Sequence, residues 1–296
     1  MGVYVSIEAG GTKFICAYGD SPGQLHDRVR IETRDPEETM GEVSEYLSQV
    51  SRKYQIDAIG LACFGPLDLD ESSSTYGSIT HTPKLAWKHF NIVDCIKKKY
   101  DVPIGFDTDV NAAALGEQQW GSGRGLDNVV YMTIGTGIGL GAVVEGRLLH
   151  GAMHAEAGHM SIFQDVSVDS FGGVCPYHGA CLEGLASGPA IKERWGVCSA
   201  LDLPVDHVAW ELEADYLARA MTNVTLCFSP QRIILGGGVM RQPGLIDKVQ
   251  RKTQSLINGY IKNEACDNWQ RFIVAPDFGD DAGIVGAFAL AMNVNN

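Results

Sequence analysis

Hydrophobic and polar residues follow two periods along the chain, one typical of strands and one of helices. Near the start, apolar runs of strand length at 3–8, 13–18 and 25–31 predict a hairpin and a third strand. Residues 35–38 read Asp-Pro-Glu-Glu, which gives an N-cap, a proline at the first helical position and a glutamate three residues after the cap. We therefore predict a helix from about residue 36, whose apolar face consists of Met40, Val43, Leu47, Val50 and Tyr54.

The alternation of strand and helix continues to the end of the chain. Further strands are predicted at 58–64, 104–106, 129–134, 139–144 and 232–235, and further helices at 92–100, 110–119, 244–260 and 281–292. A long helix is also predicted from about residue 206, with one face made by Leu217, Met221, Val224 and Phe228. Strands that alternate with helices are typical of an α/β protein.

A strand, a turn rich in glycine and threonine, and a second strand occur twice in the chain. Residues 7–12 read Ile-Glu-Ala-Gly-Gly-Thr, and residues 134–139 read Ile-Gly-Thr-Gly-Ile-Gly. We interpret the pair as an internal repeat of two lobes whose turns hold a polyphosphate across a cleft, although Gly-rich hairpins also resemble each other by chance. The predicted domains are an N-terminal small lobe at 1–112, completed by the C-terminal helix 281–296, and a large lobe at 113–280 with the nucleotide site.

Composition and charge narrow the class of ligand. The chain has 296 residues, which suggests two domains of ordinary size, and a net charge of −13. This charge argues against nucleic acid, which binds through lysine and arginine, but not against a nucleotide held by backbone N–H groups and magnesium. No apolar run is long enough to span a membrane, and a strand-like run directly follows Met1 in place of a secretion leader. We therefore expect a cytoplasmic protein that binds neither nucleic acid nor membrane.

The Gly-rich turns have the chemistry of phosphate sites. Adjacent glycines let the backbone approach an anion, and N–H groups, a hydroxyl and an ammonium bind phosphate oxygens. Glu8, at the end of the first strand, is placed to hold Mg²⁺ through its waters. Plain hairpins and a strand-to-helix turn are the alternatives. The candidate nucleotide-binding residues are Gly10, Gly11, Thr12 and Lys13 in the first turn, Thr133, Gly135, Thr136 and Gly137 in the second, and Gly237 and Gly238 after the strand at 232–235.

One strand ends and a helix begins at 107–111, which read Asp-Thr-Asp-Val-Asn. Asp109 in this place is either the N-cap of the helix or a general base that takes a proton from a sugar hydroxyl attacking the γ-phosphate of ATP. Its position at the end of a strand, beside two phosphate turns, favours the base. Asp107 is the competitor, but Asn111 begins the same helix as Asp109 and suits sugar binding, so we choose Asp109.

The densest group of polar residues lies between 154 and 183. Cys175, His178 and Cys181 follow each other at three-residue intervals and His159 precedes them, which gives the Cys₂His₂ ligand set of a structural zinc ion. The alternatives are a loop with two free thiols and a disulfide. Carboxylates nearby are either acceptors for sugar hydroxyls or ordinary surface residues. The candidates for sugar binding are Glu156 and Glu183, to which we add Gly65 after the strand at 58–64.

Taken in order along residues 8–238, these motifs resemble the ROK family of bacterial sugar kinases and repressors. The resemblance implies an α/β fold with two lobes, actin-like or ribonuclease H-like, with a central cleft and a zinc-stabilised loop. It implies Mg-ATP and structural zinc as cofactors, a sugar as substrate and a homodimer. It also implies roles for single residues, with Asp109 as catalytic base, Asn111, Glu156, His159 and Glu183 as sugar contacts, and Thr133, Gly188, Pro189, Gly237 and Gly238 near the nucleotide.

Two departures from the family pattern refine the expected activity. Many members begin the first motif with Asp where this chain has Glu8, so the reach to magnesium differs. The zinc loop, usually Cys-x-Cys-Gly-x-x-Gly-Cys, is here Cys-Pro-Tyr-His-Gly-Ala-Cys, a shorter version that is similar to the bacterial fructokinase branch. This branch implies phosphorylation of D-fructose to fructose 6-phosphate. Our hypothesis for His159 is that one ring nitrogen binds zinc while the other donates to a sugar hydroxyl.

Other functions fit parts of the same pattern. A kinase for glucose, mannose or N-acetylmannosamine shares every motif, and pocket shape decides between these sugars. A sugar-sensing regulator without catalysis is disfavoured by the presence of Asp109, Lys13 and both Gly-rich turns. A DNA-binding repressor is disfavoured because the chain is acidic and only seven residues precede Glu8.

Overall fold

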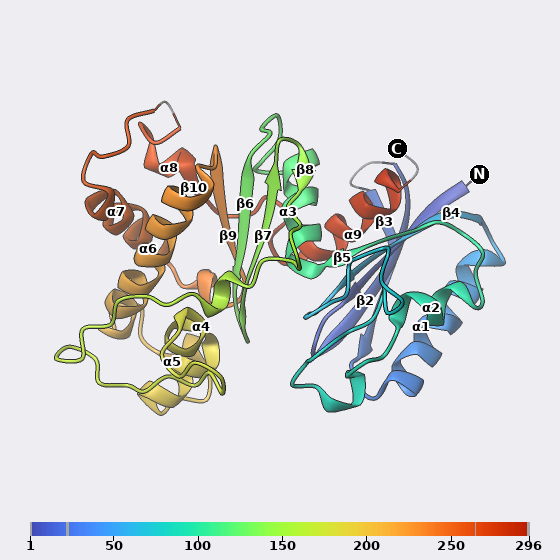
Figure 1. Cartoon of the computed structure of the whole chain (residues 1–296), viewed down its shortest axis with the longest axis horizontal. Helices are drawn as coiled ribbons and strands as arrows, with labels where there is room; N and C mark the ends of the chain where they lie inside the picture. The colour runs from blue at the N-terminus through green and yellow to red at the C-terminus, as the bar shows by residue number, and fades with distance from the viewer. Residues whose placement is uncertain (1, 22–23, 264, 295–296) are drawn as a thin grey trace. The chain divides into compact units, whose positions relative to one another are not determined.

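The computed structural model describes residues 2–21, 24–263 and 265–294, and Figure 1 shows its elements. Residues 1, 22 and 23 of the predicted small lobe, residue 264 of the large lobe and residues 295 and 296 of the last predicted segment lie outside this range. The strands are β1 (Gly2–Ala9), β2 (Lys13–Ser21), β3 (Gln24–Glu32), β4 (Gln55–Cys63), β5 (Ile104–Thr108), β6 (Val129–Ile134), β7 (Ile138–Val144), β8 (Arg147–Leu148), β9 (Arg232–Gly236) and β10 (Ile273–Val274). The α-helices are α1 (Pro36–Ser51), α2 (Ile92–Lys97), α3 (Asp109–Trp120), α4 (Leu182–Ala186), α5 (Gly188–Trp195), α6 (Ala209–Phe228), α7 (Leu245–Ile257), α8 (Trp269–Phe272) and α9 (Ala282–Asn293). Short 3₁₀ helices are η1 (Leu85–Trp87), η2 (Ala157–His159), η3 (Ala200–Asp202), η4 (Val239–Arg241) and η5 (Gly279–Asp281).

The strands form two sheets of the same design. The first has the order β3-β2-β1-β4-β5, in which β1 is antiparallel to β2 and parallel to β4, and β4 is parallel to β5. The second has the order β10-β9-β6-β7-β8, in which β6 is antiparallel to β7 and parallel to β9, and β9 is parallel to β10. Each sheet thus extends an antiparallel hairpin with parallel strands on the side of its first strand. The internal repeat predicted from the two Gly-rich turns is confirmed.

Helices cover both faces of the first sheet, because successive side chains of a strand point to opposite faces. Phe14 and Cys16 of β2 belong to the core that includes α1 and α2. Ile15 and Ala17 of the same strand instead pack with Ile284 of α9. Four of the five residues predicted for the apolar face of α1 are confirmed as buried residues of that helix, namely Met40, Val43, Leu47 and Val50. The fifth, Tyr54, lies beyond the end of α1 and packs against the same core while half-buried.

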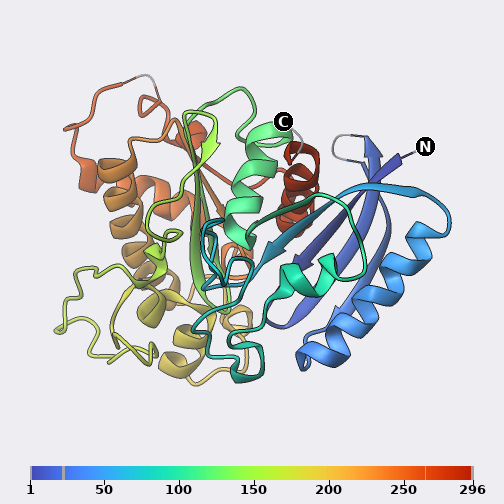
Figure 2. The same cartoon turned by 45° about the vertical axis from the view of Figure 1, so that its right-hand side comes forward.

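The last helix, α9, packs closely on the first sheet and beside α3 (Figures 1 and 2). Glycines permit this approach. A Cβ atom on Gly60 of β4 would lie 1.7 Å from the carbonyl oxygen of Ala287, and one on Gly286 would lie 2.0 Å from that of Ala112. Interiors are packed too densely to absorb such overlaps, so both positions require glycine. Although α9 is apolar, no helix in the described part of the chain has both the length and the apolar character needed to cross a membrane.

A local signal in the sequence sets the start of α1. The carboxylate of Asp35 accepts the N–H of Glu38 at 2.9 Å, and Pro36 is the first helical residue, as the sequence predicts. The guanidinium of Arg34 holds Glu38 in turn, with 2.9 Å between Nε and Oε2. The side chain of Glu38, the glutamate three residues after the cap, therefore forms an ion pair with Arg34.

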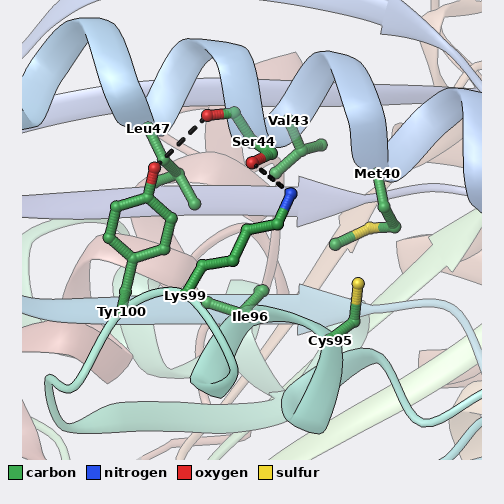
Figure 3. A pocket seen from close by; sticks show the side chains of 8 residues that line it. All are labelled: Met40, Val43, Ser44, Leu47, Cys95, Ile96, Lys99 and Tyr100. Carbon is green, nitrogen blue, oxygen red and sulfur yellow. Dashed lines mark hydrogen bonds between the residues drawn. The ribbon is translucent and has the colours of Figure 1, made fainter.

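A small hollow lies between α1 and the turn that follows α2 (Figure 3). The helix predicted at 92–100 ends at Lys97, and the next residues turn back to contact α1. In this turn Nζ of Lys99 donates to Oγ of Ser44 at 2.9 Å, and the hydroxyl of Tyr100 donates to the carbonyl of Ser44 at 3.3 Å. No predicted site residue lines the hollow, whose walls are Met40, Val43, Ser44, Leu47, Cys95, Ile96, Lys99 and Tyr100.

The chain divides into two compact units. Among the described residues, the first unit comprises 2–124, 148–154 and 281–294, and the second comprises 125–147 and 155–280. The first sheet with α3 and α9 belongs to the first unit. The sequence-based limit after residue 112 falls inside α3, which lies whole in the first unit.

Candidate active site and metal centre

Three parallel strands of the first unit end at one edge of its sheet. Ala9 of β1 lies opposite Cys63 of β4, and Cys63 lies opposite Thr108 of β5. Residues at or just past these strand ends share the edge where α/β proteins place their ligand sites. Three predicted site residues lie there, namely Glu8, Gly65 and Asp109.

The turn between β1 and β2 is held by its own backbone and by the residue that follows β3. The N–H of Gly10 donates to the carbonyl of Lys13 at 3.0 Å, so a phosphate role for Gly10 rests on close backbone approach rather than on this N–H. The hydroxyl of Thr33 donates to the carbonyl of Gly10 at 2.7 Å. Lys84 also lies beside the turn, because a Cβ on Gly11 would be 3.0 Å from its Cε. Thr33 and Lys84 belong to no motif, so no sequence signal points to them.

Two carboxyl groups at this edge have raised pKa values. Burial raises the pKa of Asp109 to about 6, and burial together with the charge of Asp109 raises the pKa of Glu8 to about 7. Asp109 accepts the N–H of Val110 at 2.9 Å. Within the described residues, Oε2 of Glu8 is buried and has no hydrogen-bond partner. A buried carboxylate oxygen without a donor fits a cation, and Mg²⁺ prefers oxygen ligands.

The start of α3 separates the roles of its two aspartates. Thr108 is the N-cap, since its hydroxyl accepts the N–H of Asn111 at 3.1 Å, and the N-cap alternative for Asp109 is therefore excluded. Asp107 is buried, and its carboxylate already accepts from Thr108 N–H at 2.7 Å, Asn111 Nδ2 at 2.8 Å and His150 Nε2 at 2.7 Å. The carboxylate of Asp107 is thus already engaged by three donors within the protein, whereas Asp109 is the aspartate with the raised pKa. His150 lies outside the predicted motifs, and only the fold brings it to Asp107.

The second unit gathers its predicted nucleotide residues around the turn between β6 and β7. The N–H of Gly135 donates to the carbonyl of Gly137 at 2.9 Å, and the carbonyl of Gly135 accepts the N–H of Gly188 at 2.8 Å. The second bond brings the start of α5, including Pro189, to the turn. Gly237 has a φ of +93°, and a Cβ there would lie 2.3 Å from the carbonyl at the end of β6. Glycine is required at this position, and the turn after β9 can lie directly on the turn after β6.

The remaining predicted nucleotide residues flank these contacts. Each Gly-rich turn contains an exposed threonine, which is Thr12 in the turn between β1 and β2 and Thr136 in the turn between β6 and β7. Thr133 is the last but one residue of β6. Gly238 lies on the other side of the second turn, with its N atom 3.9 Å from the place of a Cβ on Gly135.

Glu183 supports the second turn from α4. Its Oε2 accepts the N–H of Ile138 at 2.8 Å, and a Cβ on Gly137 would lie 2.7 Å from the same oxygen. One oxygen of this predicted sugar contact is therefore used within the protein. The contact joins residues that are 45 positions apart in the sequence, which is why periodicity cannot reveal it.

Four candidate metal ligands converge in the second unit. The ligand atoms of His159, Cys175, His178 and Cys181 all lie within 4.8 Å of one another. Nδ1 of His159 lies 3.7 Å from Sγ of Cys175 and 3.6 Å from Sγ of Cys181, and Nδ1 of His178 lies 3.6 Å from Sγ of Cys175. Bond lengths of about 2.3 Å for Zn–S and about 2.05 Å for Zn–N place neighbouring S and N atoms of a tetrahedron about 3.5 Å apart. The four side chains thus fit a tetrahedral zinc ion, and all eight cysteines of the chain are free thiols rather than disulfides.

Backbone contacts shape this cluster. Cys175 and Gly179 form an isolated β-bridge, with Gly179 N–H donating to the carbonyl of Cys175 at 2.9 Å. This tight loop carries His178 back toward Cys175. Cys181 is the N-cap of α4, and its sulfur accepts the N–H of Gly184 at 3.4 Å. Burial raises the pKa of the Cys181 thiol, and the hydrogen bond from the N–H of Gly184 opposes this shift.

Two further predicted sugar contacts lie at or near the segment 154–159. Gly65 packs against His154, since a Cβ on Gly65 would be 3.2 Å from Cε1 of that ring. Nε2 of His154 accepts the N–H of Leu67 at 3.0 Å, which holds the chain just after Gly65. Glu156 is exposed, and its carbonyl accepts the N–H of His159 at 3.0 Å. The backbone of Glu156 is therefore hydrogen-bonded to one of the candidate metal ligands.

Comparison with known proteins places the chain in a family. The model described as ROK family matches residues 4–294. A relative from Bacillus subtilis is 48% identical over 286 residues, which cover 96% of this chain and 94% of the relative. The fructokinase of Pediococcus pentosaceus is 41% identical over 286 residues, which cover 97% and 96% of the two chains. The ROK hexokinase of Thermus thermophilus has a similar structure, with a TM-score of 0.77, 26% identity and 98% of both chains covered. This chain belongs to the ROK family.

Proposed function

We propose that this protein transfers the γ-phosphoryl group of Mg-ATP to a hexose, with D-fructose as the preferred sugar and fructose 6-phosphate as the product. The observation that carries the proposal is the partly buried carboxylate of Asp109, which has a raised pKa and lies at the strand edge beside a Gly-rich turn. The 41% identity with a fructokinase along nearly the whole chain supports fructose as the sugar.

Asp109 is the general base of the proposed reaction. It takes the proton of the sugar hydroxyl while the hydroxyl oxygen forms the new P–O bond, and the bond from the γ-phosphorus to the bridging oxygen breaks to release ADP. A pKa of about 6 leaves the carboxylate ionised at neutral pH and makes it more basic than an exposed aspartate. The proposed sugar contacts are Gly65, Asn111, Glu156, His159 and Glu183.

The two Gly-rich turns are the proposed phosphate ligands. In the first unit, Lys13 supplies a positive charge, and the unpartnered oxygen of Glu8 binds Mg²⁺ or one of its waters. The other residues proposed for the nucleotide are Gly10, Gly11 and Thr12 in the first unit, and Thr133, Gly135, Thr136, Gly137, Gly188, Pro189, Gly237 and Gly238 in the second.

The Cys/His cluster is the proposed site of a structural zinc ion. Protein side chains supply all four ligands, so the ion has no open position for catalysis. Because Nδ1 of His159 faces the two sulfurs, its Nε2 is the ring atom proposed to contact a sugar hydroxyl. Zinc bound in this way fixes both the orientation and the tautomer of that ring.

The proposal is tested by a coupled assay of ADP release with Mg-ATP and fructose, mannose, glucose or N-acetylmannosamine. Fructose is expected to give the highest kcat/KM. Asp109→Asn is expected to lower it by about 10²–10⁴-fold in a folded protein, because the base is lost. Asp101→Asn, at an exposed position of the same unit, is the matched control. Preference for another sugar contradicts the fructose assignment, and full activity of Asp109→Asn contradicts the base.

Two wider expectations also follow from the family. A homodimer is proposed, and light scattering on the purified protein is expected to give twice the mass of 32.0 kDa. A cytoplasmic location is proposed because ATP is available there and because free thiols persist in that compartment.

A further inference from the structure

A chain of hydrogen bonds connects α3 with the segment 148–154 of the same unit. Nε2 of His150 lies 2.7 Å from Oδ2 of Asp107, and Oδ1 of Asp107 accepts from Nδ2 of Asn111 at 2.8 Å. Only 2% of the Asp107 side chain is exposed, whereas 43% of the His150 side chain is exposed. The chain thus runs from the amide of Asn111, through a buried carboxylate, to an imidazole at the surface.

These contacts determine which way the amide of Asn111 points. An ionised carboxylate can only accept, so Asp107 must face the NH₂ end of the amide, and Oδ1 of Asn111 occupies the other end. The backbone at this position is also held, because the N–H of Asn111 donates to the hydroxyl of Thr108. The side chain of Asn111 is therefore fixed both at its backbone and at its amide.

We propose that Asp107 and His150 are positioning residues that orient the amide of Asn111 toward the hexose, an inference that rests on the proposed function. Nε2 of His150 is the donor, since the carboxylate of Asp107 has no hydrogen to give. A protonated imidazole makes this bond charge-assisted, and such bonds are roughly twice as strong as neutral ones. The carboxylate of Asp107, and with it the bond to Asn111, is therefore held in place most firmly when His150 is charged.

The same pair makes sugar affinity depend on pH. Asp107 is the group whose charge acts on His150: its hydrogen bond, the largest effect, and its field raise the pKa of His150, and partial burial opposes them. The charged pair is complete below the raised pKa of His150 and becomes a neutral hydrogen bond as the pH rises through it. The KM for the sugar is therefore expected to increase over that range. The kcat instead follows the ionisation of Asp109.

Two variants of His150 separate positioning from a merely structural role. His150→Leu removes the donor, and His150→Gln keeps an N–H donor without the charge. The KM for fructose is expected to rise about tenfold in His150→Leu, the effect of losing one charge-assisted hydrogen bond, with kcat and the KM for ATP within about twofold of wild type. In His150→Gln most of the affinity is expected to return, but the KM for fructose no longer changes with pH.

A second histidine–aspartate pair in the same unit provides the control. Nε2 of His26 lies 3.6 Å from Oδ1 of Asp20 on the hairpin of β2 and β3, and His26→Leu is expected to leave every constant unchanged. Thermal melting verifies that each variant is folded. An unchanged fructose KM in His150→Leu, or a pH-dependent KM in His150→Gln, overturns the inference while the kinase stands. If the wild type phosphorylates no hexose, the proposed function fails before any variant is compared, and the inference falls with it.

Discussion

Replacing Cys181 with serine removes one of the four ligands that converge on the proposed zinc site. The S···N distances of 3.6–3.7 Å agree with the edge of a zinc tetrahedron, so a missing thiolate leaves an incomplete site. His159 and Cys175 are 16 residues apart, and the ion ties them into a closed loop. Closing a loop of about 15 residues stabilises a fold by about 3 kcal/mol. For a chain of 296 residues, with an unfolding entropy of about 2.1 cal/mol/K per residue, that loss lowers Tm by about 5 °C.

The assay combines metal analysis with thermal melting. Purified wild-type protein is expected to contain one zinc ion per chain, and Cys181→Ser is expected to contain almost none and to melt at the lower temperature. Cys198→Ser is the matched control, because Cys198 is an exposed cysteine of the same unit outside the cluster. Equal zinc content and equal Tm in Cys181→Ser and wild type refute a four-ligand metal site.

Three further predictions follow from single contacts. The raised pKa of Asp109 predicts that kcat is level above pH 7 and falls tenfold per unit below about pH 6, whereas an inflection near 4 contradicts a base with a raised pKa. Gly60→Ala is expected to lower the free energy of unfolding by about 3 kcal/mol in a denaturant titration, because its Cβ would overlap the carbonyl oxygen of Ala287. Gly41→Ala, with open space around it, is the control. Equal stability of the two variants contradicts the close packing of α9 on β4. Glu183→Ala is expected to raise the KM for ATP about tenfold, because the N–H of Ile138 at the start of β7 loses its acceptor. A change in the sugar KM alone contradicts the idea that Glu183 supports the turn between β6 and β7.

Much of the fold and of the candidate site can be predicted because its signals are local. The N-cap at Asp35 and the apolar residues of α1 lie within a few positions of each other in the sequence, and the structure confirms both the cap and the burial of Met40, Val43, Leu47 and Val50. The two Gly-rich turns predict a repeat, and the matching order of the two sheets confirms it. The Cys/His ligands are close in sequence, so their spacing alone predicts a cluster, and their side chains do converge.

The contacts that escape prediction join residues far apart in the sequence. His150 and Asp107 are 43 positions apart, and neither lies in a pattern that marks the other. They meet because the segment 148–154 folds into the first unit, and no period of apolar residues reports this contact. The cap of α3 illustrates a local ambiguity, because Thr108 and Asp109 are both good N-cap residues and only the hydroxyl contact to Asn111 decides between them.

The most direct test of the proposed chemistry is to follow the phosphoryl group itself by phosphorus NMR. With wild-type protein, Mg-ATP and fructose, fructose 6-phosphate and ADP are expected to appear in equal amounts. Asp109→Asn, folded by its melting curve, is expected to form both at least about 100-fold more slowly. ADP without sugar phosphate, or unchanged transfer by Asp109→Asn, would contradict a hexose kinase that uses Asp109 as its base.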